Sequence, residues 1–194
     1  MKAIDFPERE CGEWFISGTR FGTMVHAKLG IAAENSGKLV ATVRREARRL
    51  AEEQGRDLIL VDGPPGVGCP VIAAVTGASR VLAVTEPTPA GIHDLTRVLE
   101  LTGHFGIPAA VAVNKWDIHP AMTAQIEAQA ASMGATIAGR IRYDRAVTAA
   151  QVAGKTVAEH GGMAAEDIRR LWQAVQPEDT PGASKEKASA CAQR

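Results

Sequence analysis

The sequence has 194 residues, of which 45% are apolar, and its 22 basic side chains balance its 22 acidic ones. A chain of this length fits one domain with a substantial core. Because the net charge is zero and only 4% of the residues are aromatic, we expect neither nucleic acid nor an anionic membrane surface as a partner.

The three cysteines, Cys11, Cys69 and Cys191, lie far apart and form no C-x-x-C pair. This usage favours a reducing compartment over a disulfide framework. The first ten residues, MKAIDFPERE, are charged and lack the apolar core of a signal peptide. No stretch reaches the roughly 18 apolar residues that a membrane span requires. We therefore predict a cytoplasmic protein without a membrane span.

The first part of the chain predicts little regular structure before one long helix. Residues 1–22 contain prolines and glycines that interrupt any period, so we expect them to be irregular, with a short extended run over 23–29. A helix is predicted over about 37–54, with Ser36 as its N-cap and Gly55 at its end.

Strands and helices then alternate. The continuous apolar run 58–61 predicts a central parallel strand that is buried on both faces. Further strands are expected over 80–85, 109–113 and 136–141, and helices over 70–76, 90–105, 122–133 and a short stretch ending at Val152. Four such units predict an α/β fold with a three-layer, doubly wound, mainly parallel sheet. We expect one domain over 1–176 and a disordered tail over 177–194.

Ligands of open α/β sheets bind beyond the carboxyl ends of the strands. Asp62 directly follows the run 58–61, where a carboxylate can hold Mg²⁺ between the phosphates of a nucleotide. The turn Gly63-Pro64-Pro65-Gly66 lets backbone amides approach a γ-phosphate, and its prolines stiffen it. Alternatively, Asp62 only caps the next helix after a tight turn.

Two later strands also end in polar segments. Asn114, Lys115 and Asp117 follow the strand 109–113, where the Asn amide can bond a purine while the Lys stem packs beside it; the alternative is an ordinary turn. The segment 137–144 can flank the base with backbone groups, or it can be a plain strand-to-helix connection.

The phosphate-binding pattern G-x-x-x-x-G-K-[ST] is absent from the sequence. Gly37-Lys38 is followed by leucine, and Gly154-Lys155-Thr156 has Ala149 where the pattern requires its first glycine. Cys69 begins a predicted helix, whose dipole can make a thiol reactive, although such a cysteine more often only packs.

Taken together, these segments resemble the MinD/ParA/Mrp superfamily of P-loop ATPases, from about Gly12 to Glu159. The similarity is greatest to the branch with an inserted ferredoxin-like domain that carries two 4Fe-4S clusters. The matching segments are TRFGTMVHAKLG, ENSGKLVATVR, LILVDGPPGVGCPVIAAVTGA, VTEPTPAGIHDLTRVLEL, HFGIPAAVAVNKWD and GRIRYDRAVTAAQVAGKTVAE.

The resemblance implies ATP and Mg²⁺ bound at a dimer interface. By position, Asp62 resembles the Walker-B carboxylate and Gly66 the switch glycine, while Asn114 resembles the adenine-reading residue. The loop from Ile141 to Asp144 resembles the one beside the base, with Arg142 in place of the family's usual proline. The deviant Walker A loop, KGGxGKT, and the cluster cysteines of the 4Fe-4S insert are absent. A split gene, a truncated product or a mis-assigned start would each explain this.

Three hypotheses follow for the function. The first is the C-terminal portion of a MinD-like ATPase linked to iron–sulfur or redox chemistry, weak or inactive alone, acting as a homodimer or with a complementary P-loop-bearing chain and a redox partner. The second is a non-catalytic assembly module that pairs with a P-loop-bearing chain, since a missing first strand leaves a sheet edge unpaired. The third is a doubly wound domain that binds another phosphorylated ligand.

Overall fold

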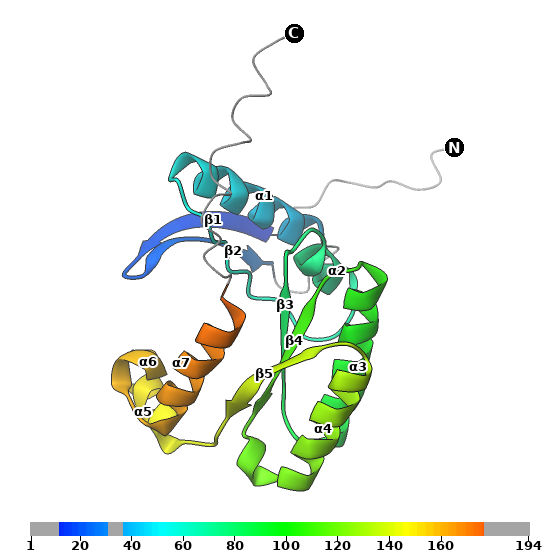
Figure 1. The fold of residues 1–194 in the computed structure, drawn as a ribbon. Coiled ribbons are helices and arrows are strands. Elements are labelled where there is room, and N and C mark those ends of the chain that lie inside the picture. The colour runs from blue at the N-terminus through cyan, green and yellow to red at the C-terminus, as the bar shows by residue number, and fades with distance from the viewer. Residues whose placement is uncertain (1–11, 31–36, 177–194) are drawn as a thin grey trace, which may run out of the picture.

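The computed structural model describes residues 12–30 and 37–176. The predicted N-cap Ser36 and the predicted tail 177–194 lie outside the described residues. Figure 1 shows a β-hairpin and a long helix at one end of the molecule and a parallel sheet with its helices below them. Within the described ranges, every helix is too short or too polar to cross a lipid bilayer.

The hairpin consists of β1 (Gly12–Thr19) and β2 (Gly22–Leu29), which pair antiparallel around a two-residue turn. The prediction that residues 1–22 are irregular is therefore wrong for β1, whereas the extended run over 23–29 is confirmed by β2. Trp14 lies opposite Ala27, and Ile16 lies opposite Val25. Such cross-strand pairs stabilise a hairpin despite flanking glycines, and they are invisible when each segment is considered alone.

Arg20, in the turn of this hairpin, bonds residues that are more than 130 positions later in the sequence. Its guanidinium donates through Nε and Nη2 to both carboxylate oxygens of Glu159, at 3.0 Å each, and Nη2 also donates to the carbonyl of Gly154. Glu159 lies in α6 (Val157–His160) and forms a capping box with Thr156. These contacts lower the pKa of Glu159 from 4.5 to about 2, with the Arg20 hydrogen bond as the largest cause.

Replacement of Arg20 by glutamine should bring the pKa of Glu159 back toward the ordinary glutamate value of about 4.3. A depressed carboxyl pKa stabilises the fold above the unfolded-state value, and this stabilisation is lost as the pH falls from about 4.5 toward about 2. The measurement is an NMR pH titration of the Glu159 carboxyl carbon in both proteins. An unchanged pKa in the variant would show that the capping box alone causes the shift.

Two helices follow the hairpin close to their predicted positions. α1 (Lys38–Glu53) begins after Gly37, which has a φ of 81°, and α2 (Cys69–Val75) begins at the exposed Cys69. Arg44 of α1 donates to the carbonyl of Ala73 at 2.8 Å, so α1 is held directly against α2.

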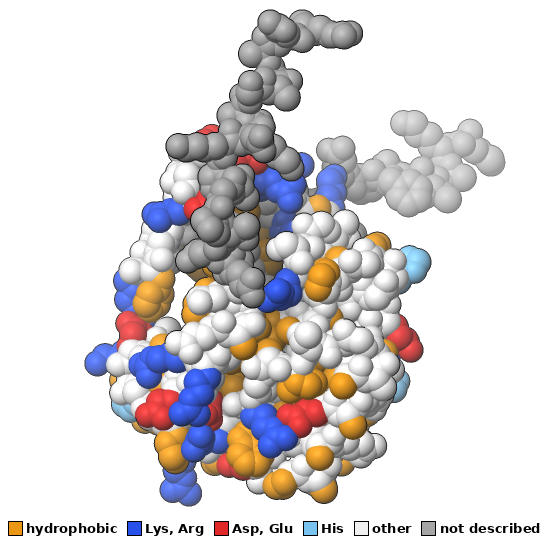
Figure 2. Space-filling view, viewed as in Figure 1, with side chains coloured by type: hydrophobic (Ala, Val, Ile, Leu, Met, Phe, Trp, Pro, Cys, Tyr) orange, Lys and Arg blue, Asp and Glu red, His pale blue; other side chains and the backbone are white. Residues whose placement is uncertain are grey.

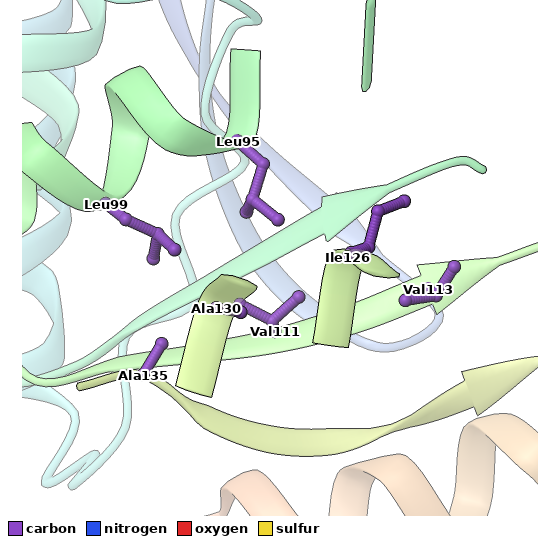
Figure 3. Packing of buried hydrophobic residues seen from close by; sticks show 7 residues of the cluster. All are labelled: Leu95, Leu99, Val111, Val113, Ile126, Ala130 and Ala135. Atoms are coloured by element: carbon purple, nitrogen blue, oxygen red, sulfur yellow. The ribbon is translucent and has the colours of Figure 1, made fainter. Parts of the chain in front are cut away.

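The sheet consists of three parallel strands in the order β3-β4-β5: β3 (Val81–Thr85), β4 (Ala109–Asn114) and β5 (Thr136–Ile141). α3 (Pro89–His104) and α4 (Pro120–Ser132) connect them. All five elements confirm the sequence predictions to within about two residues at each end. Figure 3 shows the core that this arrangement buries between the helices and the strands: Leu95, Leu99, Val111, Val113, Ile126, Ala130 and Ala135.

The opposite face of β5 is covered by α7 (Met163–Val175), where Leu171 packs near Gly139. α5 (Arg145–Val152) ends as predicted, whereas α6 and α7 were not predicted. Helices on both faces confirm the three-layer α/β fold class. Figure 2 shows charged side chains of both signs gathered over the end of the molecule where α5, α6 and α7 lie.

The prediction of a buried central strand over 58–61 is wrong. Leu58, Ile59, Leu60 and Val61 form no strand in the structure and are 48%, 40%, 81% and 38% exposed. A strand requires a hydrogen-bonded neighbour, and among the described residues no strand pairs with this segment. The apolar run identified a chain segment suited to a sheet, but not the neighbour that would complete it.

Candidate functional site

The candidate site lies where β3, β4 and β5 end, and we call it the carboxyl rim: residues 85–88, 114–118 and 141–144. The register pairs Thr85 with Val113 and Asn114 with Ile141, so the three strands end at the same level. The structure thus brings together Asn114, Asp117 and the loop Ile141–Asp144, which the sequence places on two separate segments.

Glu86 links the first two loops of the carboxyl rim. One of its carboxylate oxygens, Oε1, accepts a hydrogen bond from Asn114 Nδ2 at 3.3 Å and lies 2.7 Å from Lys115 Nζ. Lys115 adopts the left-handed conformation with a φ of 53°, which is uncommon for a residue with a side chain and is typical of functional turns. Among the described residues, none bonds the Oδ1 of Asn114, so this acceptor remains free.

Asp117 links the second and third loops. Its Oδ1 accepts a hydrogen bond from the backbone N–H of Tyr143 at 2.8 Å, which fixes the loop after β5 against the turn after β4. The carbonyl of Trp116 in the same turn accepts from the hydroxyl of Thr123 at 2.9 Å, at the beginning of α4. The Asp117 side chain therefore positions the loop, and Tyr143, which is 54% exposed, is directed to solvent.

Both side-chain oxygens of Asp144 accept hydrogen bonds from helix N-termini. Oδ1 accepts from the N–H of Ala146 at 2.9 Å, and Oδ2 accepts from that of Ala164 at 3.1 Å. Asp144 thus caps α5 and the beginning of α7 together, and these backbone bonds lower its pKa. Its carboxylate is used within the protein, so any ligand contact from this position comes from the backbone.

Arg142 turns toward α7. Its Nε and Nη2 donate to Asp167 Oδ2 and Oδ1 at 2.7 and 2.9 Å, and its backbone N–H donates to Oδ2 at 3.2 Å. The Asp167 side chain is only 6% exposed, and the Arg142 hydrogen bond is the largest cause of its lowered pKa. Arg142 therefore fastens the loop beside the site to α7. Sequence reasoning missed Asp167 because it lies 25 residues from Arg142 with no motif to mark it.

The turn after β3 is closely packed. Thr88 caps α3 by accepting a hydrogen bond from the N–H of Gly91 at 2.9 Å, and the hydroxyl of Thr85 donates to the carbonyl of Gly91 at 3.0 Å. A Cβ on Gly91 would collide with the carbonyl oxygen of Glu86. Glu86 also bonds Asn114, so this close approach constrains the backbone of a residue that orients Asn114.

The predicted phosphate-side residues, Asp62 to Gly66, lie in the segment between Val61 and α2. Asp62 is exposed, and no hydrogen bond or ion pair joins it to another of the described residues. Its neighbour Gly63 lies against Ala74 of α2, the helix that leads into the amino end of β3. Gly66 has a φ of 88°, a conformation that disfavours other residues. The roles of these residues, Asp62, Gly63, Pro64, Pro65 and Gly66, stay predictions.

Two open cavities lie away from the carboxyl rim. One of about 290 Å³ opens where β3, β4 and β5 begin, and Arg80, Ala109 and Ile137 contribute to its lining. Among the described residues, no group of three or more His, Cys, Asp or Glu side chains could hold a metal ion.

Comparison with solved structures defines the class of fold. The chain superimposes on the MinD cell division protein of Aquifex aeolicus with a TM-score of 0.58 and 22% identity, covering 75% of this chain and 62% of that one. For the MinC:MinD complex of the same organism the TM-score is 0.62 with 20% identity, covering 86% and 68%. For the septum site-determining protein MinD of Pyrococcus horikoshii OT3, complexed with Mg-ADP, the values are 0.58 and 17%, covering 81% and 61%.

The chain therefore has the α/β fold of the MinD ATPases. No family model matches it. Two curated relatives are uncharacterized proteins of Methanocaldococcus jannaschii: MJ0578, 30% identical over 92 residues, and MJ0579, 26% identical over 115 residues. The matches span 47% and 59% of this chain but only 32% and 41% of those proteins.

Proposed function

We propose that this chain supplies the base-binding side, and one magnesium ligand, of a MinD-like ATPase. The observation that carries the proposal is the position of Asn114 at the carboxyl end of the central strand β4. Glu86 orients its amide nitrogen, and Oδ1 remains free to accept. An Asn amide can bond adenine through its acceptor and its second N–H together.

The neighbouring residues define one side of a slot for a purine. The Asp117 side chain holds the backbone of Tyr143, and the Arg142–Asp167 and Asp144 contacts fix the loop Ile141–Asp144 to α5 and α7. A loop held by this many side chains presents its backbone groups in one conformation, which lowers the entropic cost of binding. The P. horikoshii MinD, which has the same fold, is complexed with Mg-ADP.

Asp62 would provide the carboxylate that holds Mg²⁺, and the turn Gly63-Pro64-Pro65-Gly66 would approach the terminal phosphate. Magnesium is commonly held by one or two carboxylates together with the phosphates themselves, so a single exposed Asp62 fits this role chemically. A bound Mg²⁺ would neutralise the charge that develops on the phosphates during hydrolysis. Because the sequence contains no phosphate-binding loop, we expect weak or no ATPase activity from this chain alone.

Two finer parts of the proposal rest on the resemblance. The first is that hydrolysis serves iron–sulfur or redox chemistry; a 4Fe-4S cluster would belong to the family's ferredoxin insert. The second is the action as a homodimer or with a complementary P-loop-bearing chain. The assembly role without catalysis remains the alternative function. It is favoured by the outer edge of β3, with which no strand of the described ranges pairs.

The test is an NMR titration of the ¹⁵N-labelled chain with Mg-ATP at about 5 mM, a concentration that occupies most sites if Kd is near 1 mM. We expect shifts at the amides of Asn114, Lys115 and Tyr143. Asn114→Ala should weaken binding about tenfold, because losing a hydrogen bond of about 1.4 kcal/mol changes Kd by that factor. The matched control is Gln125→Ala, which removes an exposed amide from α4.

Equal shifts with Mg-CTP would contradict purine recognition and favour another phosphorylated ligand. Binding that survives Asn114→Ala unchanged would overturn the assignment of the base side. Asp62→Ala is expected to weaken Mg-ATP but not adenosine, which separates the metal role from the base role.

A further inference from the structure

The side-chain amide of Asn114 can bond Glu86 in one orientation only. Its nitrogen Nδ2 donates to Glu86 Oε1 at 3.3 Å. A carboxylate only accepts hydrogen bonds, whereas the two ends of an Asn amide differ, since the nitrogen donates and the oxygen accepts. Turning the amide over would place Oδ1 against a negatively charged oxygen and break this bond. Glu86 therefore fixes Oδ1, which no described residue bonds, as the acceptor that is left for a ligand.

Lys115 in turn holds the carboxylate of Glu86. Its Nζ lies 2.7 Å from the same Oε1, and because an ammonium only donates, an acceptor must occupy this position. The backbone carbonyl of Glu86 accepts from the N–H of Thr88 at 2.7 Å, so the side chain extends from a fixed turn. The Glu86 and Lys115 side chains are 43% and 39% exposed, so a ligand can reach the groups beside them. Two donors thus determine the position of one oxygen.

The orientation of the Asn114 amide determines which purine it can bond. Position 6 of adenine carries an amino group, which donates, whereas position 6 of guanine or hypoxanthine carries an oxygen, which accepts. An Asn amide bonds adenine with its oxygen at the amino group and its nitrogen at N7. A 6-oxo purine in the same position would place its oxygen against Oδ1, so that two acceptors face each other without a proton between them. To relieve this, the amide would have to turn over and lose its bond to Glu86.

Resting on the proposed function, we propose that Glu86 determines the base specificity of this site. Held by Lys115, it keeps Oδ1 of Asn114 available to the base and so selects 6-amino purines against 6-oxo purines. This selection needs no contact between Glu86 and the base, which makes Glu86 a positioning residue.

The other candidate for recognising the base is Asp117. Its carboxylate could accept from the N1–H and 2-amino groups of guanine, which are neighbouring donors. However, its Oδ1 already accepts from the N–H of Tyr143 at 2.8 Å, so among the described residues only Oδ2 is left without a bond. The contacts of Asn114 and Glu86 therefore favour a 6-amino purine over guanine.

The test compares Mg-ATP with Mg-ITP, which carry the same phosphates and differ in the base only at position 6 and the adjacent N1. Each is titrated into the ¹⁵N-labelled full chain, and the amide shifts of Asn114 and Lys115 give Kd. We expect Mg-ATP to bind about tenfold more tightly, the factor for one hydrogen bond. Glu86→Ala should bring the two affinities to within about twofold, because the amide can then turn over. The matched control is Glu100→Ala at an exposed position of α3, which should keep the preference.

Two further variants test the orientation of the amide without removing the Glu86 side chain. In Glu86→Gln, the Lys115 ammonium should hold the Gln carbonyl oxygen where Oε1 lies, so the preference for Mg-ATP should persist. Adding Lys115→Met removes that donor and lets the Gln amide turn, so the double variant should lose the preference.

The outcomes separate this inference from the proposed function. Equal affinities for Mg-ATP and Mg-ITP in the wild type, or a preference that survives Glu86→Ala, would overturn the inference while the nucleotide still binds. A preference for Mg-GTP over Mg-ITP that Asp117→Asn abolishes would also overturn it, because Asp117 would then select the base. Absence of binding with all three nucleotides would overturn the proposed function together with the inference.

Discussion

Replacement of Asp167 by alanine should lower the free energy of unfolding by about 3 kcal/mol, because it leaves Arg142 without the partner that holds it bidentately. This loss is at the lower end of the range for breaking buried ion pairs, because Arg142 is 32% exposed and water can partly replace the carboxylate. Urea unfolding followed by circular dichroism measures the change. Glu166→Ala on the same helix removes an exposed carboxylate and should change stability by less than about 0.5 kcal/mol.

The same contact predicts how stability depends on pH. The pKa of Asp167 is lowered in the folded protein, chiefly by the Arg142 hydrogen bond. Its contribution is therefore complete above the unfolded-state pKa of about 3.9 and is lost as the pH falls below that value through the folded-state pKa. When the pH is lowered from 5 to below the folded-state pKa of Asp167, the free energy of unfolding should fall more for the wild type than for Asp167→Ala. Equal losses would show that the pair does not stabilise the loop.

Replacement of Gly91 by alanine should destabilise the protein by about 1–3 kcal/mol, although alanine is the better helix former. The added Cβ would collide with the carbonyl of Glu86 and lie 2.8 Å from the Thr85 hydroxyl, so the turn after β3 must move. Gly103→Ala in the same helix is the matched control, because a Cβ there meets nothing within 4 Å. It should be neutral or stabilise by up to about 1 kcal/mol.

The Gly91 variant also tests the site. Since the displaced group belongs to Glu86, which orients Asn114, Gly91→Ala should weaken adenosine binding more than its loss of stability explains. NMR titration of both glycine variants at a temperature where each is fully folded gives the comparison. Equal affinities in the two variants would show that the position of Glu86 does not control Asn114.

The sequence predicted the fold correctly where the pattern of a segment and the patterns of the segments next to it indicate the same structure. The runs that became β3, β4 and β5 are followed by helices with clear beginnings and ends, and their order predicted both the α/β fold and a rim that brings Asn114 to the loop Ile141–Asp144. The residues that hold this rim, Glu86 and Asp167, were harder to find. Glu86 could have been recognised, because it directly follows a predicted strand on the same side of the sheet as Asn114.

The prediction of a strand over Leu58–Val61 was wrong for a different physical reason. Its composition indicates a strand that is buried on both faces, and that interpretation assumed neighbours that the described residues do not provide. For β1 the error was the opposite one. Its glycines suggested an irregular segment, but pairing with β2 makes it a strand. In both cases, non-local hydrogen bonding determined the outcome, and a window of sequence contains no information about it.

The bond between Arg20 and Glu159 joins residues 139 positions apart, and this separation affects the order of events during synthesis. At about 5–20 residues per second, the ribosome needs about 7–28 s to reach Glu159 after adding Arg20. Throughout that interval the turn of the hairpin lacks this ion pair, so the pair forms only after most of the described chain has been made.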